Sequence, residues 1–177
     1  IIERRMSITT LQSRIAAFSQ LGKVMNSLGT QDKWPGFECG INQEEYGEFE
    51  ELIEKVIHHN GWYTSENVRK ALSSLSQMLQ VEKMEVWMSK YTPHDNKHNP
   101  SRIGIIMAGN LPLVGFHDFL CVLISGNKAV VKMSSDDQLL LPLVFKTLCK
   151  FLPEIKDSVE FCPHKINDFD AVIATGS

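Results

Sequence analysis

The chain has 177 residues and a formal net charge of −3, with 43% hydrophobic and 22% charged residues. This composition is that of a globular protein with one sizeable core or two small ones, and it lacks the basic runs that bind nucleic acid or an anionic membrane. Polar and charged residues such as Asp118 and Lys128 interrupt the longest apolar stretches, so we expect no transmembrane helix. The first residues, IIERRMSITT, do not resemble a secretory signal.

Hydrophobic residues recur at spacings of three and four through the first ninety residues, which is the period of amphipathic helices. A first helix is predicted from Leu11 to Leu28, with Gly29 as its stop. Asn42 and Glu45 form a capping-box pattern at the start of a second helix.

The second helix is expected to end at Asn60-Gly61, a pair that tolerates a left-handed helix cap. Thr64 can cap a third helix, and the apolar residues between Val81 and Tyr91 suggest a fourth. The sequence then turns polar, with two prolines in YTPHDNKHNPS. We therefore expect a helical N-terminal region over residues 1–91 and a linker over residues 92–101.

The hydrophobic period changes after the linker. Short apolar runs replace the helical spacing, as expected of strands buried on both faces, and helical segments over residues 113–125 and 137–151 separate the first three. Strands that alternate with helices predict right-handed crossovers and an open, mostly parallel sheet, so the fold class is α/β, with its sheet domain over residues 102–177. The predicted strands are residues 103–108, 129–131, 159–162 and 171–174.

Pro142 lies inside the apolar run LLLPLVF, where proline would break a helix that began at Ser135. Either the helix starts with Pro142 in its first turn, or it is kinked there. We favour the first interpretation because proline suits the first turn of a helix.

Three polar or small-residue segments follow predicted strands, and ligands of open parallel sheets bind beyond the carboxyl ends of the strands. Each segment combines a small or polar residue with the expected start of a helix, where free backbone N–H groups favour an anion. Together they point to a nucleotide. The segments are Gly109-Asn110-Leu111-Pro112, Lys132-Met133-Ser134-Ser135 and Thr175-Gly176-Ser177.

The stretch IGIIMAGNLPLVGFHDFLCVLISGNKAVVKMSS, followed by DFDAVIATGS, resembles the long-chain acyl-CoA reductases of the LuxC type, relatives of the aldehyde dehydrogenase superfamily. Upstream, NGWYTSENVRKALSSLSQML is also similar to that family. The resemblance implies a Rossmann-like sheet of the aldehyde dehydrogenase type and reduction of a fatty acyl thioester, on coenzyme A or on a protein, to an aldehyde. It implies NADPH as the reductant, an acyl-cysteine intermediate and a homo-oligomer.

Asn110 matches the superfamily amide that donates a hydrogen bond to the oxyanion formed at the thioester carbon. A donor aimed at developing negative charge is worth roughly 3 to 4 kcal/mol. The alternative is that Asn110 only caps the following helix, which asparagine does well. The resemblance favours the oxyanion role.

The resemblance also implies four residues that bind the cofactor. Lys132 matches a lysine that contacts the adenosine ribose, although a lysine at a strand end is often only solvated. Ser135 stands where many NAD-dependent relatives have a glutamate, and its lack of charge suits the 2′-phosphate of NADPH. Gly176 and Ser177 match the turn that receives the pyrophosphate, although a Gly-Ser pair is commonly just a turn.

Other reactive residues give weaker signals. His117 and Asp118 are adjacent on a predicted helix and do not face each other, so they form a poor catalytic dyad. His94 and His98 have no partner at metal-ligand spacing, and we expect no metal site. The cysteines lack a C-x-x-C pair and are expected to be buried, reduced thiols of a cytoplasmic protein; they are Cys39, Cys121, Cys149 and Cys162.

None of the four cysteines matches the superfamily nucleophile, which lies downstream of the T-G-S turn. The sequence is therefore expected to be the N-terminal part of a longer reductase, with little activity alone. Within the enzyme class, a relative that reduces an acyl phosphate or oxidises an aldehyde is a further possibility. The alternative outside that class is a non-catalytic α/β module that binds a nucleotide or a partner.

Overall fold

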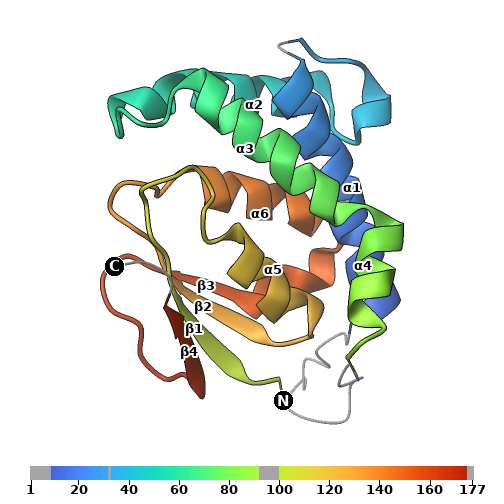
Figure 1. Cartoon of the computed structure of the whole chain (residues 1–177), viewed down its shortest axis with the longest axis vertical. Coiled ribbons are helices and arrows are strands. Elements are labelled where there is room, and N and C mark those ends of the chain that lie inside the picture. The colour runs from blue at the N-terminus through green and yellow to red at the C-terminus, as the bar shows by residue number, and fades with distance from the viewer. Residues whose placement is uncertain (1–8, 32, 92–99, 175–177) are drawn as a thin grey trace, which may run out of the picture.

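The computed structural model describes residues 9–31, 33–91 and 100–174. A helical part precedes a four-stranded, all-parallel sheet with the strand order β3-β2-β1-β4, which confirms the α/β fold (Figure 1). The helices are α1 (Leu11–Thr30), α2 (Gln43–Lys55), α3 (Ser65–Ser76), α4 (Val81–Met88), α5 (Phe116–Ile124) and α6 (Leu140–Phe151). The strands are β1 (Arg102–Ile106), β2 (Lys128–Lys132), β3 (Val159–Cys162) and β4 (Ala171–Ala174).

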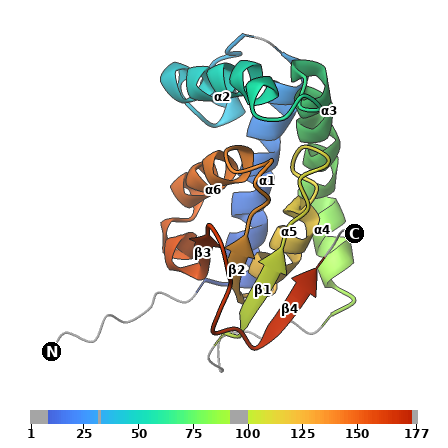
Figure 2. The ribbon, with the colours of Figure 1, turned by 90° about the vertical axis from the view of Figure 1, so that its left-hand side faces the viewer.

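The helices lie on one side of the sheet, with α1 running behind it between α3 and α6 (Figure 2). Buried side chains of both parts form a continuous hydrophobic core, which includes Phe18 of α1, Phe119 of α5 and Val131 of β2. The strands point toward the connection between α2 and α3 (Figure 2). This arrangement brings the helical part over the carboxyl end of the sheet.

The predicted caps at the N-termini of α2 and α3 are confirmed. Asn42 and Glu45 exchange side-chain hydrogen bonds with each other's backbone N–H groups, at 2.9 and 3.0 Å. Thr64 caps α3 by accepting a hydrogen bond from the backbone N–H of Asn67 at 3.2 Å. Glu45 also forms an ion pair with Lys150, which ties α2 to α6.

Two predicted helix ends are wrong. α1 continues through Gly29 to Thr30, because Gly29 is a packing residue: a Cβ atom there would lie 2.6 Å from the backbone nitrogen of Ser73 in α3. Asn60-Gly61 is not a left-handed cap, since the helical path ends earlier, in a 3-10 turn at Val56–His58. Gly29 and Asn60 were both interpreted from local rules, whereas long-range contacts decide their roles.

The helices of the sheet part begin later than predicted. α6 starts at Leu140, with Pro142 in its first turn, as in the favoured interpretation. α5 starts at Phe116 instead of residue 113 because Leu113 has a left-handed backbone (φ 56°), which cannot belong to a right-handed helix.

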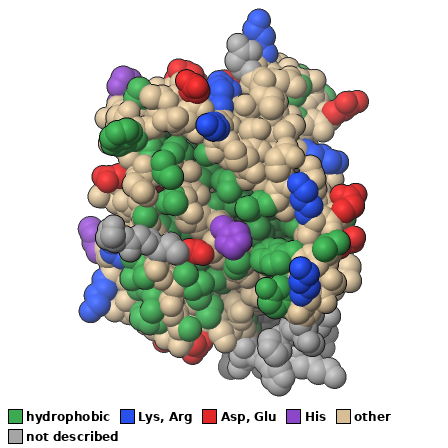
Figure 3. Space-filling model, in the orientation of Figure 1, with side chains coloured by type: hydrophobic (Ala, Val, Ile, Leu, Met, Phe, Trp, Pro, Cys, Tyr) green, Lys and Arg blue, Asp and Glu red, His purple; other side chains and the backbone are tan. Residues whose placement is uncertain are grey.

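The prediction that every strand is buried on both faces holds for β2 but is wrong for β4, whose residues are mostly exposed. Helices cover one face only. On the other face the segment from residue 163 to 170 crosses the sheet, and a Cβ atom on Gly104 would lie 2.7 Å from the Ile166 side chain. Hydrophobic side chains gather on the surface over β1 and β4 (Figure 3), where Ile106, Phe169 and Val172 are exposed.

Candidate functional site

The four strands end in register at one edge of the sheet. Ile106 pairs with both Lys132 and Ala174, and Lys132 pairs with Cys162. The loops that follow the strands therefore start at the same level. β1 lies between β2 and β4, so the chain direction across the sheet reverses beside β1, and such a switch point is where open α/β sheets bind ligands.

The loops after β1 and β2 are in direct contact. A Cβ atom on Gly109 would lie 2.3 Å from Ser134 Oγ and 2.6 Å from Ser134 Cβ. Only glycine allows this approach. The contact places Asn110, the next residue, beside the segment that contains Ser134 and Ser135.

Asn110 does not cap α5. The N-cap residue of α5 is Gly115, which provides no side-chain hydrogen bond, and a turn over residues 112–115 separates it from Asn110. The Asn110 residue is exposed, and no hydrogen bond joins its amide to another described residue. The capping alternative is therefore wrong, and the amide is open to a molecule that binds at this edge.

The backbone on both sides of Asn110 is anchored by the α2–α3 connection. The Tyr63 hydroxyl lies 3.1 Å from the Gly109 carbonyl oxygen and 3.0 Å from that of Leu111, and its single proton is shared between these two acceptors. The Asn60 side-chain amide donates to the Gly109 oxygen at 3.0 Å. Tyr63 is only 1% exposed, and its hydrogen bond to the Gly109 oxygen is buried, whereas the other two are partly buried.

Asp137 fixes the far end of the same loop. Its carboxylate accepts a hydrogen bond from the backbone N–H of Leu113 at 3.3 Å, and it also interacts with the Tyr63 hydroxyl. Leu113 has the left-handed conformation that costs an ordinary residue roughly 1–2 kcal/mol. Burial raises the pKa of the Asp137 carboxyl above its ordinary value of 3.8. Burial, and then the negative charge of Asp137, also raise the pKa of Tyr63.

We expect the free energy of unfolding of Asp137→Asn to rise, relative to that of the unsubstituted protein, as the pH rises. A carboxyl whose pKa is raised by folding stabilises the fold fully below its ordinary pKa of 3.8, and this contribution is lost as the pH rises through the raised value. An amide does not titrate and can still accept the Leu113 hydrogen bond. Urea unfolding of both proteins from pH 3.8 upward, through the range in which the native carboxyl ionises, measures this. A free energy of unfolding of Asp137→Asn that falls with pH relative to that of the unsubstituted protein would contradict it.

The loop after β2 presents charges of both signs. Lys132 ends the strand half-buried, and Ser135 is exposed, as the cofactor hypothesis requires. Ser135 Oγ donates to the neighbouring Asp136 carboxylate at 3.3 Å, which places a negative charge beside the predicted ribose site. Gly176 and Ser177 lie outside the described residues.

The cysteines of the chain are poor nucleophile candidates. Cys121 Sγ lies 3.7 Å from His117 Nδ1 on α5, which has the appearance of a Cys-His pair. Burial and the charge of Asp118 nevertheless raise the pKa of Cys121, and burial raises the pKa of Cys149 and Cys162. These groups remain thiols at neutral pH, whereas the thiolate is the reactive form.

Metal binding has no support in the part of the chain that the structure describes. No group of three or more potential ligand side chains gathers within it. His94 and His98 lie outside the described residues. His117 and Asp118 approach only to 4.0 Å, which is too long for a hydrogen bond.

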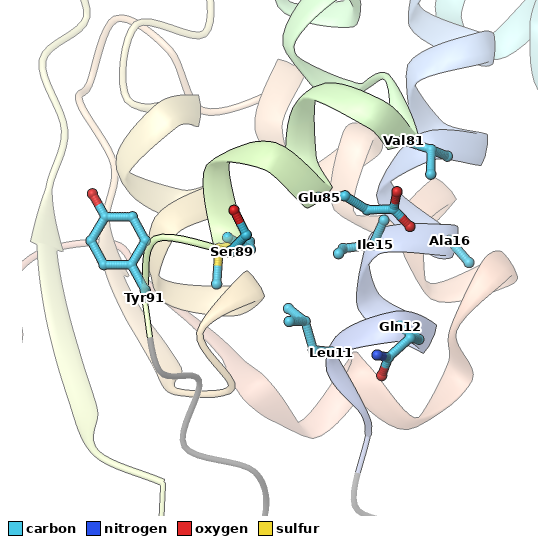
Figure 4. Close-up of a pocket in the computed structure, with 9 residues that line it drawn as sticks. Leu11, Gln12, Ile15, Ala16, Val81, Glu85, Ser89 and Tyr91 are labelled. Carbon is cyan, nitrogen blue, oxygen red and sulfur yellow. The ribbon is translucent and has the colours of Figure 1, made fainter.

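One small pocket borders this edge, and a larger one lies away from it. Tyr63, Ser135 and Asp137 help to line one of about 110 Å³, which has room for a few water molecules but not for a nucleotide. A second pocket, of about 410 Å³, lies between α1 and α4, and its lining residues include Leu11, Ile15 and Val81 (Figure 4). Because α4 lies far from the carboxyl end of β4 (Figure 1), this second pocket is not part of the edge site.

Three residues of the site escaped sequence analysis. Asn60 was interpreted as a helix cap, and Tyr63 and Asp137 were given no role. Their only sequence signal is a polar or aromatic residue next to a helix start, which is a common pattern. Their roles depend on contacts 24 to 49 positions apart in the chain.

The fold and this edge define an open parallel α/β protein whose loops meet where sheets of this kind commonly bind ligands. The model of the acyl-CoA reductase (LuxC) family matches residues 47–174, well over half of the chain. The chain therefore belongs to the acyl-CoA reductase (LuxC) family, as its motifs predicted, and the match includes every described site residue. The comparisons with curated proteins and with solved structures found no match. The wider relation to the aldehyde dehydrogenase superfamily stays a prediction.

Proposed function

We propose that the protein acts in the cytoplasm as part of an NADPH-dependent reductase that converts a fatty acyl thioester into an aldehyde. The family supports an acyl thioester as substrate. The observation that supports the proposal most is the placement of Asn110, exposed at the switch point of the sheet with both neighbouring carbonyl groups anchored. An amide in that position can act as an oxyanion donor.

The proposed reaction has two steps. A cysteine thiolate attacks the thioester carbon, the carbonyl oxygen becomes an oxyanion, and coenzyme A or the carrier thiol leaves as the acyl-cysteine forms. NADPH, when bound, supplies the hydride that releases the aldehyde and regenerates the thiolate. The Asn110 amide N–H donates to the oxyanion, and such a preorganised donor favours the charge that develops in the transition state.

We propose that Lys132, at the end of β2, and Ser135, in the loop that follows, bind the adenosine end of the cofactor. The Lys132 ammonium group can attract a phosphate or donate to a ribose hydroxyl, and Ser135 can donate without adding negative charge. Asp136 opposes a 2′-phosphate through its charge, or else accepts hydrogen bonds from ribose hydroxyls. We propose that Lys132 and Ser135 together outweigh Asp136 and that NADPH is preferred.

The thiol that carries the acyl group is proposed to be none of the four cysteines of this chain. The raised pKa values of Cys121, Cys149 and Cys162 support this, because each favours the unreactive protonated form. Cys39 is buried in the hydrophobic core, where no thioester can reach it. The nucleophile is expected in the part of the protein that follows residue 177.

The test is an assay of the full-length protein with a long-chain acyl-CoA and NADPH. We expect loss of NADPH together with formation of a fatty aldehyde and free coenzyme A in equal amounts. An acyl phosphate and an aldehyde with NADP⁺ serve as alternative substrates. Cofactor binding without turnover of any of the three would favour a non-catalytic binding module instead.

A further inference from the structure

A single buried hydroxyl anchors the backbone on both sides of Asn110. The two carbonyl groups that receive the Tyr63 hydroxyl belong to Gly109 and Leu111, the residues before and after Asn110. The Gly109 carbonyl belongs to the peptide plane that precedes Asn110, and the Leu111 carbonyl belongs to the plane one residue beyond the one that follows it. Holding both oxygens therefore fixes the backbone on either side of Asn110, and with it the position from which the Asn110 side chain projects.

The hydrogen bonds from Tyr63 to Gly109 and Leu111, here called the clamp, are reinforced at both ends of the loop. Asn60 donates a second hydrogen bond to the Gly109 oxygen, and Asp137 holds the N–H of Leu113 in its left-handed conformation. Strained backbone of this kind persists where surrounding contacts determine it. The loop from Gly109 to Leu113 is thus fixed by side chains of the α2–α3 connection and of the loop after β2.

The supporting residues are themselves fixed. The Asn60 side-chain oxygen accepts from the backbone N–H of Trp62 at 3.0 Å, and the Asn67 side chain donates to the Trp62 carbonyl at 2.9 Å. Thr64, directly after Tyr63, is the N-cap residue of α3. The tyrosine is consequently held at the start of a helix, which places its hydroxyl more reproducibly than a free loop does.

We propose that Tyr63, with Asn60 and Asp137 in support, is a positioning residue that aims the Asn110 amide at the reacting carbonyl oxygen. The inference rests on the proposed function and assigns to the helical part a role in the site. Tyr63 does not touch the substrate. Its effect on the reaction is exerted through Asn110, and this distinguishes it from a residue that only stabilises the fold.

A double-mutant cycle in the full-length protein tests this dependence. We expect Tyr63→Phe to lower the single-turnover rate of acyl-enzyme formation by about tenfold, because small misplacements of a reacting group are costly. In an Asn110→Ala background the same change should alter the rate by less than about twofold, since the group that it positions is gone. Cofactor affinity should stay within about twofold in both backgrounds.

Two further variants distinguish an effect on the position of Asn110 from an effect on the stability of the fold. Tyr46→Phe is a matched control, because it removes another buried hydroxyl, which donates to the Gln31 carbonyl oxygen at 2.9 Å between α1 and α2. It should leave the acylation rate unchanged. Asn60→Ala removes one bond to the same Gly109 oxygen and should act in the same direction as Tyr63→Phe, so the test survives if the tyrosine variant does not fold.

The outcomes are distinct. Equal losses from Tyr63→Phe in both backgrounds, or no loss in either, would overturn the positioning role while leaving the proposed reaction intact. An Asn110→Ala protein with an unchanged acylation rate would refute the oxyanion role itself, and the positioning role with it.

Discussion

Asn110→Ala is expected to lower the rate of acyl transfer in the full-length protein by about a hundredfold or more, the usual effect of removing an oxyanion donor. The affinity for NADPH should change little, because the loop after β2 is proposed to bind the adenosine end. The structure adds a reason to expect a functional effect: Asn110 is exposed and does not cap α5. Single-turnover acylation and a cofactor titration measure the two quantities separately.

Asn127→Ala provides the control for loss of an amide. Asn127 precedes β2 at the opposite edge of the sheet, where its side-chain oxygen accepts from the backbone N–H of Ser101 at 3.1 Å. This variant should acylate at the normal rate. Loss of thermal stability without loss of acylation in Asn110→Ala would assign Asn110 a structural role only.

Ser135→Glu is expected to weaken NADPH binding at least tenfold more than NADH binding. A carboxylate at Ser135 would face the dianionic 2′-phosphate, and like charges about 4 Å apart repel by roughly 4 kcal/mol at an effective dielectric near 20. Ser135 is exposed, so solvent and salt reduce this value. Titration of both cofactors at low and high salt therefore gives the magnitude as well as the sign.

Two variants isolate charge from size. Ser135→Gln adds similar bulk without charge and should affect both cofactors alike. Asp136→Asn removes the carboxylate that already lies beside Ser135 and should favour NADPH, the opposite sign to Ser135→Glu. Equal losses of NADPH and NADH in Ser135→Glu would mean that Ser135 does not face the ribose.

The sequence predicted the elements well because their signals are local. The capping box at Asn42 and Glu45, the Thr64 cap and the position of Pro142 all depend on residues within one turn of a helix. The parallel sheet followed from the change of hydrophobic period after the linker. The predicted strands of the described chain are all present, and each lies within two residues of its expected bounds.

The errors share a different cause. Gly29 is a close contact between α1 and α3 rather than a stop, and Asn60 binds a carbonyl group in the sheet part rather than ending α2. The left-handed Leu113 has no sequence signal, because leucine disfavours that conformation. Such features are fixed by tertiary contacts, which override local preference. The anchoring of Asn110 was unpredictable for the same reason.

The clamped loop restricts which insertions and deletions this protein can tolerate. Loops commonly absorb changes of length, but the segment from Met107 to Leu113 is held to β2 at its start and to Asp137 at its end. One added residue in extended backbone would advance the chain by about 3.3 Å. A shift of that size would separate the donors and acceptors that anchor this loop beyond hydrogen-bond distance. Apart from Gly109 and Asn110, substitutions can therefore accumulate in this segment more readily than changes in its length. The spacing from β1 to Asn110 should be nearly invariant where the reaction is retained.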